Sequence, residues 1–192
     1  MVFQKELLER SAGDHDHLCP RQVLGVRMGV YAAELLGLDL PQSEKRLYVF
    51  IESDGCFVDG VSAATGCTVG HRTMAVYDFG KIAATFVDTL TDRAIRISPH
   101  PDIRKIVPVY VPNIENHWRQ YLEAYQVIPF DEMFVVSPVQ LSVSIEKLIS
   151  REDARAYCEQ CGEEIFNERE MHVGGKILCR SCAGSAYYVH LS

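Results

Sequence analysis

Two pairs of cysteines near the end of the sequence have the residue type and the spacing of a metal site. Cys158 and Cys161 form one Cys-x-x-Cys pair, Cys179 and Cys182 form the second, and 17 residues separate the pairs. Two cysteines three positions apart bring both sulfurs to one ion when the backbone turns tightly, and Gly162 can supply the positive φ that this turn needs. The pattern therefore predicts a closed structural zinc site with four thiolate ligands.

A redox role is the alternative for these pairs, but a thioredoxin-like Cys-x-x-Cys belongs in a βαβ unit that residues 155–192 are too short to form. We expect the second pair to begin a terminal helix, whose N-terminal dipole favours thiolates. His172 is a competing ligand, although four cysteines already complete the site. A closed site leaves no position for chemistry, so its expected role is to fold a segment of about 40 residues that lacks a core of its own.

A second group of candidate ligands lies near the start of the sequence. His15, His17 and Cys19 belong to the run DHDHLCP, which ends in a proline suited to the first position of a helix. In an extended segment the side chains of His17 and Cys19 face the same side. Neighbouring aspartates can orient the imidazole rings, and a helix N-terminus stabilises a thiolate. This run therefore predicts half of a metal site.

Cys56 and Cys67 stand at the two ends of a predicted small-residue helix over 57–64. Core packing is the alternative interpretation for each, because free cysteine is among the most buried residue types. Four side chains are predicted to form a second metal site: His17, Cys19, Cys56 and Cys67. Thiolates select soft or borderline metals, so this site is expected to hold a second zinc or another thiophilic ion.

Hydrophobic periodicity predicts the elements that must position these residues. The predicted helices cover 2–10, 20–36 with Gly37 as its cap, 57–64 and 114–125. The predicted strands cover 46–52, 73–79, 81–88, 93–98 and 133–143. A tight turn over Asp78–Lys81, with a glycine where positive φ is needed, is expected to join two of these strands as a hairpin.

Two of the predicted helices carry an apolar face. In the helix over 20–36 the face is expected to be core, and it consists of Leu24, Met28, Tyr31, Ala32 and Leu35. In the helix over 114–125 the stripe is largely aromatic and consists of Ile114, Trp118, Tyr121, Leu122 and Tyr125. Such a stripe is typical of a core or of a dimer interface.

Composition and charge narrow the classes of partner. The chain has 192 residues, of which 47% are hydrophobic and 23% charged, so we expect a main domain over 1–150 and an appendage over 151–192, joined by a polar linker at 150–155. The sequence has no membrane-length apolar run and no signal-peptide core, which predicts a cytoplasmic protein without a membrane partner. Its net charge of -7 argues against nucleic acid as a partner.

The last segment of the chain resembles a known class of zinc finger. The run CEQCGEEIFNERE, followed by CRSC, contains a cysteine knuckle, an Ile before a Glu-Arg pair, and a second Cys-x-x-Cys. This arrangement is similar to the treble-clef fingers of the DksA/TraR type, in which the finger accompanies binding to RNA polymerase. The resemblance implies a small C-terminal treble-clef zinc finger. Residues 153–192 carry four Lys or Arg against six Asp or Glu, which favours contact with protein over nucleic acid.

A series of short motifs runs through the first half of the chain: H-x-H-x-C-P, G-x-R, C-x-x-D-G, G-C-T-x-G and D-x-G-K. The residues that form them are His15, His17, Cys19-Pro20, Gly25, Arg27, Cys56, Asp59-Gly60, Gly66-Cys67-Thr68, Gly70 and Asp78–Lys81. Together they resemble the FmdE family, which takes its name from a component of formylmethanofuran dehydrogenase. That family usually has HGH and CPG, whereas this chain has Asp16 and Arg21 at those positions, which adds charge near the site.

The FmdE resemblance implies an α+β fold, with a mixed or antiparallel sheet and packed helices, a homodimer, and a metal at the His/Cys cleft. The first functional hypothesis is accordingly a metal-binding accessory protein, with enzyme subunits as possible protein partners. Nothing in the chain predicts a pterin or iron–sulfur site, so oxidation of a formyl group would belong to other subunits.

Two other functional hypotheses stay open at this point. One is a cysteine-dependent enzyme, in which an unligated cysteine is the nucleophile and Lys81 binds an anionic group. Its candidate bases are His17 and His71, and its candidate orienting carboxylates are Asp54 and Asp59. The other is a protein-binding regulator that acts through the zinc finger.

Overall fold

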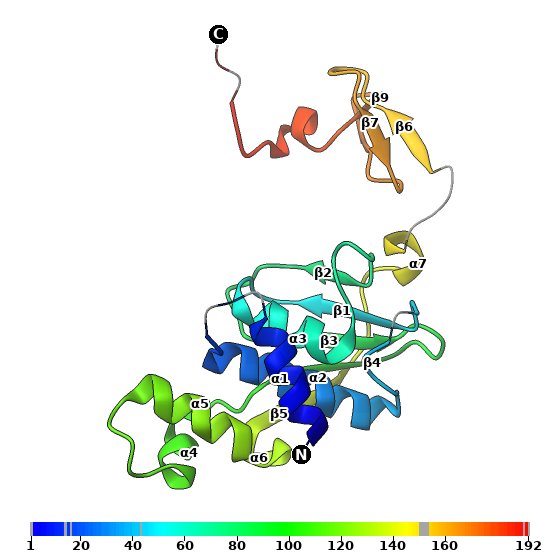
Figure 1. Ribbon diagram of the computed structural model, residues 1–192. Helices are drawn as coiled ribbons and strands as arrows, with labels where there is room; N and C mark the ends of the chain where they lie inside the picture. Colours follow the sequence, from blue (N-terminus) through cyan, green and yellow to red (C-terminus); the bar gives the residue numbers. More distant parts are fainter. Residues whose placement is uncertain are drawn as a thin grey trace. The chain divides into compact units, whose positions relative to one another are not determined.

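The computed structural model describes residues 2–13, 15, 17–42, 44–149, 154–189 and 191. The chain forms two compact units, Met1–Ser142 and Val143–Ser192 (Figure 1). The linker predicted at 150–155 falls mainly on residues outside this description. Among the helices of the described ranges, none combines the length and the apolar character that crossing a bilayer requires.

The first unit begins with two helices, and the sequence determines the ends of the second one. Helix α1 spans Val2–Ala12 and α2 spans Pro20–Leu36. Before Pro20, the backbone N–H of Cys19 donates to the side-chain oxygen of Gln22 at 2.7 Å, which satisfies a donor at the start of α2. At its other end Gly37 adopts a φ of 68°, and its N–H donates to the Glu34 carbonyl. Both predicted ends of α2 are confirmed.

Five strands form one mixed sheet within the described residues, in the order β2-β1-β3-β4-β5 (Figure 1). They are β1 (Leu47–Ile51), β2 (Met74–Val76), β3 (Ala84–Asp88), β4 (Arg93–Pro99) and β5 (Phe134–Val139). Strand β2 runs parallel to β1, and the other neighbouring pairs are antiparallel. A mixed sheet with packed helices confirms the predicted α+β class.

The predicted hairpin over 73–88 is wrong, because β2 and β3 lie on opposite sides of β1. The segment between them crosses the end of β1. There the N–H groups of Phe79 and Lys81 both donate to the carbonyl of Glu52, at 2.9 and 3.0 Å. The Asp78 carboxylate accepts from the N–H of Gly80, whose φ is 66°. The turn itself is present, but its hydrogen bonds go to β1 and not to a hairpin partner.

Four further helices complete the first unit: α3 (Cys56–Thr65), α4 (Ile103–Tyr110), α5 (His117–Val127) and α6 (Phe130–Met133). Helix α4 was not predicted, since Pro108 lies inside it and two prolines stand before it. Helix α5 begins later than predicted because Asn116 caps it, accepting the Arg119 N–H at 3.0 Å.

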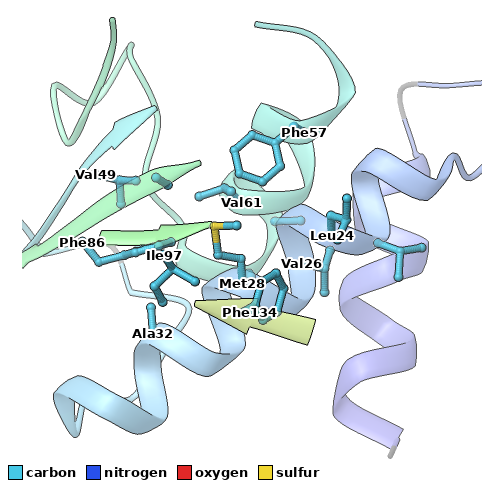
Figure 2. Packing of buried hydrophobic residues seen from close by; sticks show 14 of the residues in the cluster. Leu24, Val26, Met28, Ala32, Val49, Phe57, Val61, Phe86, Ile97 and Phe134 are labelled. Atoms are coloured by element: carbon cyan, nitrogen blue, oxygen red, sulfur yellow. The ribbon is translucent and has the colours of Figure 1, made fainter. Parts of the chain in front are cut away.

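The core lies where α2 and α3 cover one face of the sheet. Figure 2 shows Met28 of α2 and Phe57 of α3 directed toward Phe86 of β3, and all three are fully buried. On the predicted core face of α2, Leu24, Met28 and Ala32 are buried, while Tyr31 and Leu35 are partly buried against the same cluster. Helix α2 is also buried on its other sides because α1, α3 and α5 all pack against it.

Backbones of α2 and α3 touch at two glycines. A Cβ atom on Gly25 would overlap the Phe57 carbonyl oxygen and lie 2.8 Å from the Val61 nitrogen. A Cβ atom on Gly60 would overlap the Gln22 carbonyl oxygen. Both positions therefore require glycine for reasons of space. This contact fixes the first turns of the two helices beside each other.

Arg27 attaches α5 to α2. Its guanidinium is buried and donates to the carbonyls of Tyr125 and Ile128, at 3.1 and 2.7 Å, while it lies 4.5 Å from the centroid of the Phe130 ring. Burial lowers the pKa of Arg27 to about 10, which leaves it charged at neutral pH. The end of α5 is thus held by a buried charge with backbone partners.

The second unit contains two short hairpins and little core. Strands β6 (Arg155–Tyr157) and β7 (Glu164–Phe166) form one hairpin, and β8 (Met171–Val173) and β9 (Lys176–Leu178) form the other. A short helix α7 (Ile145–Leu148) precedes them, and a helical turn η1 (Ser181–Ser185) follows.

The contact between α2 and α3 predicts a specific sensitivity. Replacing Gly60→Ala forces the backbones apart, and we expect the free energy of unfolding to fall by about 1 to 3 kcal/mol, as for other overpacked cores. Chemical denaturation followed by circular dichroism measures the change. Gly70→Ala is the matched control, because a Cβ there meets only the Thr68 hydroxyl at 3.9 Å. Equal stability of the two variants would show that the close contact does not matter.

Candidate metal centres

The four cysteines of the second unit converge as predicted. Their sulfur atoms all lie within 4.8 Å of one another, and those of Cys161 and Cys179 are 3.9 Å apart. The first pair sits on a tight turn after β6, in which the Gly162 N–H donates to the Cys158 carbonyl at 2.9 Å and Gly162 has a φ of 78°. The second pair follows β9, and Cys182 belongs to the helical turn η1. The expected knuckle with a positive-φ glycine is therefore confirmed.

Electrostatics at this cluster favour a bound cation. Backbone N–H groups of Cys161 and Cys179 lower the pKa of the Cys158 thiol to about 6, so this sulfur is readily available as a thiolate. A hydrogen bond with the Cys179 side chain, together with burial, raises the pKa of Cys182 to about 12. Four thiolates this close repel one another, and a divalent ion removes that conflict.

Apolar burial in this unit is too small to replace the metal. Its core cluster within the described residues consists of Cys158, Ile165 and Leu178, and one of the three is itself a ligand. The two hairpins are tied by reciprocal bonds: the Glu159 N–H donates to the Ile177 carbonyl, and the Ile177 N–H donates to the Glu159 carboxylate. His172 lies on β8 and is not part of the four-cysteine cluster. Four thiolates with this spacing fit structural zinc.

In the first unit a different group of ligand atoms converges. One nitrogen of His15, the sulfur of Cys56 and one oxygen of Asp59 all lie within 4.8 Å of one another, and the His15 Nε2 and Asp59 Oδ2 atoms are 3.0 Å apart. Cys56 and Asp59 are three residues apart in the first turn of α3, so the helix presents both on one side. His15 approaches them from the segment between α1 and α2.

Cys19 adjoins this group at the start of α2. Burial and a hydrogen bond with the Cys19 side chain raise the pKa of the Cys56 thiol, so the two sulfurs are in direct contact. The close approach of α2 and α3 is the cause, since each cysteine stands at the start of one helix. The predicted pairing of Cys19 with Cys56 therefore has a structural basis.

The other two predicted ligands of the core site lie elsewhere. The His17 ring meets Trp118 edge-on, with the ring centroids 5.7 Å apart. The Cys67 side chain is buried, its thiol donates to the Leu47 carbonyl at 3.4 Å, and burial raises its pKa. In the described part of the chain, neither His17 nor Cys67 belongs to a group of convergent ligand atoms. For Cys67 the core-packing interpretation fits this placement.

His15 and Asp59 were not among the predicted ligands. A signal for Asp59 was present in the sequence, because a carboxylate three positions after a cysteine in a helix shares its face. The predicted helix began one residue too late to include Cys56, which hid that relationship. His15 could not be preferred to His17 by spacing alone, because both stand in the same loop.

An α+β unit with a Cys/His/Asp group, followed by a four-cysteine zinc finger, is the class of protein that these features define. The sequence model of the family described as "FmdE, Molybdenum formylmethanofuran dehydrogenase operon" matches residues 14–135, and that of the "Prokaryotic dksA/traR C4-type zinc finger" matches residues 154–188. The first match covers more than half of the chain. This protein therefore belongs to the FmdE family and carries a C-terminal zinc finger of the dksA/traR type.

Two similar proteins add detail. A protein of Archaeoglobus fulgidus named "Probable S-adenosyl-L-methionine-binding protein" is 31% identical over 205 residues, an alignment that covers 95% of this chain and 54% of that protein. The chain thus spans about half the length of this relative. A solved structure of an FmdE-like protein of tungsten formylmethanofuran dehydrogenase, from Syntrophus aciditrophicus, has the same fold. Its TM-score is 0.58 at 21% identity, over 97% of this chain and 95% of that one.

Removing one finger cysteine tests the role of the zinc. In a Cys161→Ser variant we expect one zinc ion fewer per chain and rapid amide exchange throughout 154–189, because the remaining core is too small to hold the hairpins. The first unit should keep its protection. Elemental analysis and hydrogen exchange measure the two effects, and His172→Ala, which leaves the four sulfurs intact, should behave as wild type. Retained protection in the metal-free finger would contradict a structural role.

Proposed function

We propose that this chain is a metal-binding accessory protein of the FmdE family, with a zinc or another thiophilic ion held in its first unit. The proposed ligands are His15, Cys56 and Asp59, with Cys19 as the fourth. The single observation that supports this proposal best is the convergence of one nitrogen, one sulfur and one carboxylate oxygen within 4.8 Å at the start of α3. The finger, which we propose to be a treble clef, holds structural zinc and has no role in chemistry.

The chemistry of this donor set fits a borderline divalent ion. Imidazole, thiolate and carboxylate together suit zinc and its first-row neighbours better than magnesium or calcium, which prefer oxygen ligands alone. Without a metal, burial and the contact with Cys19 favour the protonated Cys56 thiol. A divalent cation displaces that proton and also replaces the proton shared between His15 and Asp59. The site is therefore better satisfied with an ion than without one.

Family membership supports the accessory role. The family takes its description from a formylmethanofuran dehydrogenase operon, and we infer that this chain assists an enzyme by carrying or presenting a metal. A homodimer and contacts with enzyme subunits belong to the same proposal. Binding of S-adenosyl-L-methionine is not carried over from the Archaeoglobus protein, because this chain covers only half of it.

A second candidate function rests on the same three side chains. Cys56, His15 and Asp59 are a nucleophile, a base and an orienting carboxylate within reach of one another, as in cysteine-dependent enzymes. The raised pKa of Cys56 disfavours the thiolate that such an enzyme needs, whereas a metal would supply it. For this reason we place metal binding first.

Metal content separates the two functions. We expect two ions per wild-type chain and one per chain of the Cys19→Ser, Cys56→Ser double variant, because only the finger site survives. Elemental analysis of the purified proteins gives the numbers. Cys67→Ala is the matched control and should keep two ions, since that thiol bonds to the Leu47 carbonyl. One ion in both the wild type and the double variant would contradict the core site.

Alkylation of Cys56 provides an independent measurement. Iodoacetamide should modify this thiol slowly in the metal-loaded protein and faster once a chelator has removed the core ion, as mass spectrometry of the Cys56 peptide can show. Rapid modification that no metal prevents, and that an Asp59→Asn change slows, would favour the cysteine-dependent enzyme instead.

A further inference from the structure

A cavity of about 440 Å³ opens beside the Cys19 thiol in the first unit. Its size lies within the range of about 300 to 1,000 Å³ that is typical of small-molecule sites. The start of α2, the start of α4 and one side of α5 line it, so three helices define its shape. None of the proposed metal ligands except Cys19 is among the residues that line it.

One wall of this cavity is aromatic. Trp118, Tyr121 and Tyr125 all line it from α5, and the two tyrosine rings are stacked with their centroids 5.7 Å apart and their planes at 18°. Tyr125 is buried, whereas Trp118 is 45% exposed, so the wall runs from the interior to the surface. Stacked, partly exposed rings favour a flat aromatic ligand, which can pack its face against them.

The opposite charge balance to that of the whole chain prevails in this cavity. Arg21 and Arg104 line it, and its lining within the described residues contains no Asp or Glu, although the chain carries a net charge of -7. No ion pair between either guanidinium and a carboxylate is found among the described side chains. Each arginine also stands in the first turn of a helix, where the helix dipole adds positive potential.

We propose that this cavity binds a small planar aromatic molecule that carries an anionic group, such as a carboxylate, phosphate or sulfonate. The ring packs on Trp118 and Tyr121, and the anion pairs with the guanidinium groups of Arg21 and Arg104. Cys19 belongs both to this cavity and to the contact with Cys56, so the bound molecule lies next to the proposed metal ligands. Binding does not depend on the metal, since the aromatic and cationic groups stand outside that ligand set.

Trp118 makes the proposal directly measurable because it is the only tryptophan in the chain. Its indole N–H therefore gives a single resonance in a ¹H–¹⁵N spectrum of the full-length protein. The probes are naphthalene-2-carboxylate, which has only a flat ring and an anion, and its neutral amide. We expect saturable movement of the Trp118 resonance with both, and about ten-fold tighter binding of the carboxylate, the contribution of a charge-assisted pair.

Arginine variants test which groups recognise the anion. In the Arg21→Gln, Arg104→Gln double variant the preference for the carboxylate over the amide should disappear, and each single variant should lose part of it. Arg93→Gln is the matched control, because it removes the same charge at the start of β4, whereas the cavity is lined by Pro99 at the end of that strand. Cys19→Ser should bind the carboxylate as the wild type does, which separates this site from the metal site.

Three results would overturn the proposal. The first is a Trp118 resonance that neither probe moves in a saturable way. The second is equal binding of the acid and the amide by the wild type. The third is a resonance that moves with protein concentration and not with probe, which would identify the aromatic wall as an interface between copies of the chain.

Discussion

The backbone contact between α2 and α3 is the constraint on which the rest of the first unit depends. Gly25 and Gly60 let the two helices approach until main-chain atoms touch, and any side chain at either position would separate them. Because each helix begins only a few residues before its glycine, the contact also brings the two helix starts together. Cys19 and Cys56 stand at those starts. The glycines of the family motifs thus act as spacers, and the chemistry depends on their having no side chain.

Arg27 extends this arrangement to the third side of the site. One face of α2 carries Gly25 against α3, while the Arg27 side chain reaches the last turn of α5 and holds its carbonyls. A buried guanidinium requires its partners in place, since its charge would otherwise be left without compensation. The aromatic wall of the cavity and the group of metal ligands are therefore both positioned by one helix. The four-cysteine finger differs in that its order comes from thiolates and a metal instead of packing.

The sequence predicted local features well and long-range placement poorly. Both ends of α2 and the knuckle around Gly162 follow from proline and glycine chemistry within a few residues, and the four finger cysteines share one recognisable spacing. The position of β2 on the far side of β1 could not be predicted, because the hydrogen bonds that decide it go to Glu52, more than twenty residues earlier. Cys67 was predicted beside Cys56 from sequence proximity, but the fold buries it against the start of β1.

The order of strands in the sheet has a consequence for how this protein behaves at high concentration. Strands β2 and β5 form the two edges, and an exposed edge is a template on which further chains can add by strand pairing. Here β2 offers only three residues, and β5 contains Pro138, which has no N–H to donate to an incoming strand. Both edges therefore resist aggregation, and any ordered self-association of this unit would have to use helical surfaces.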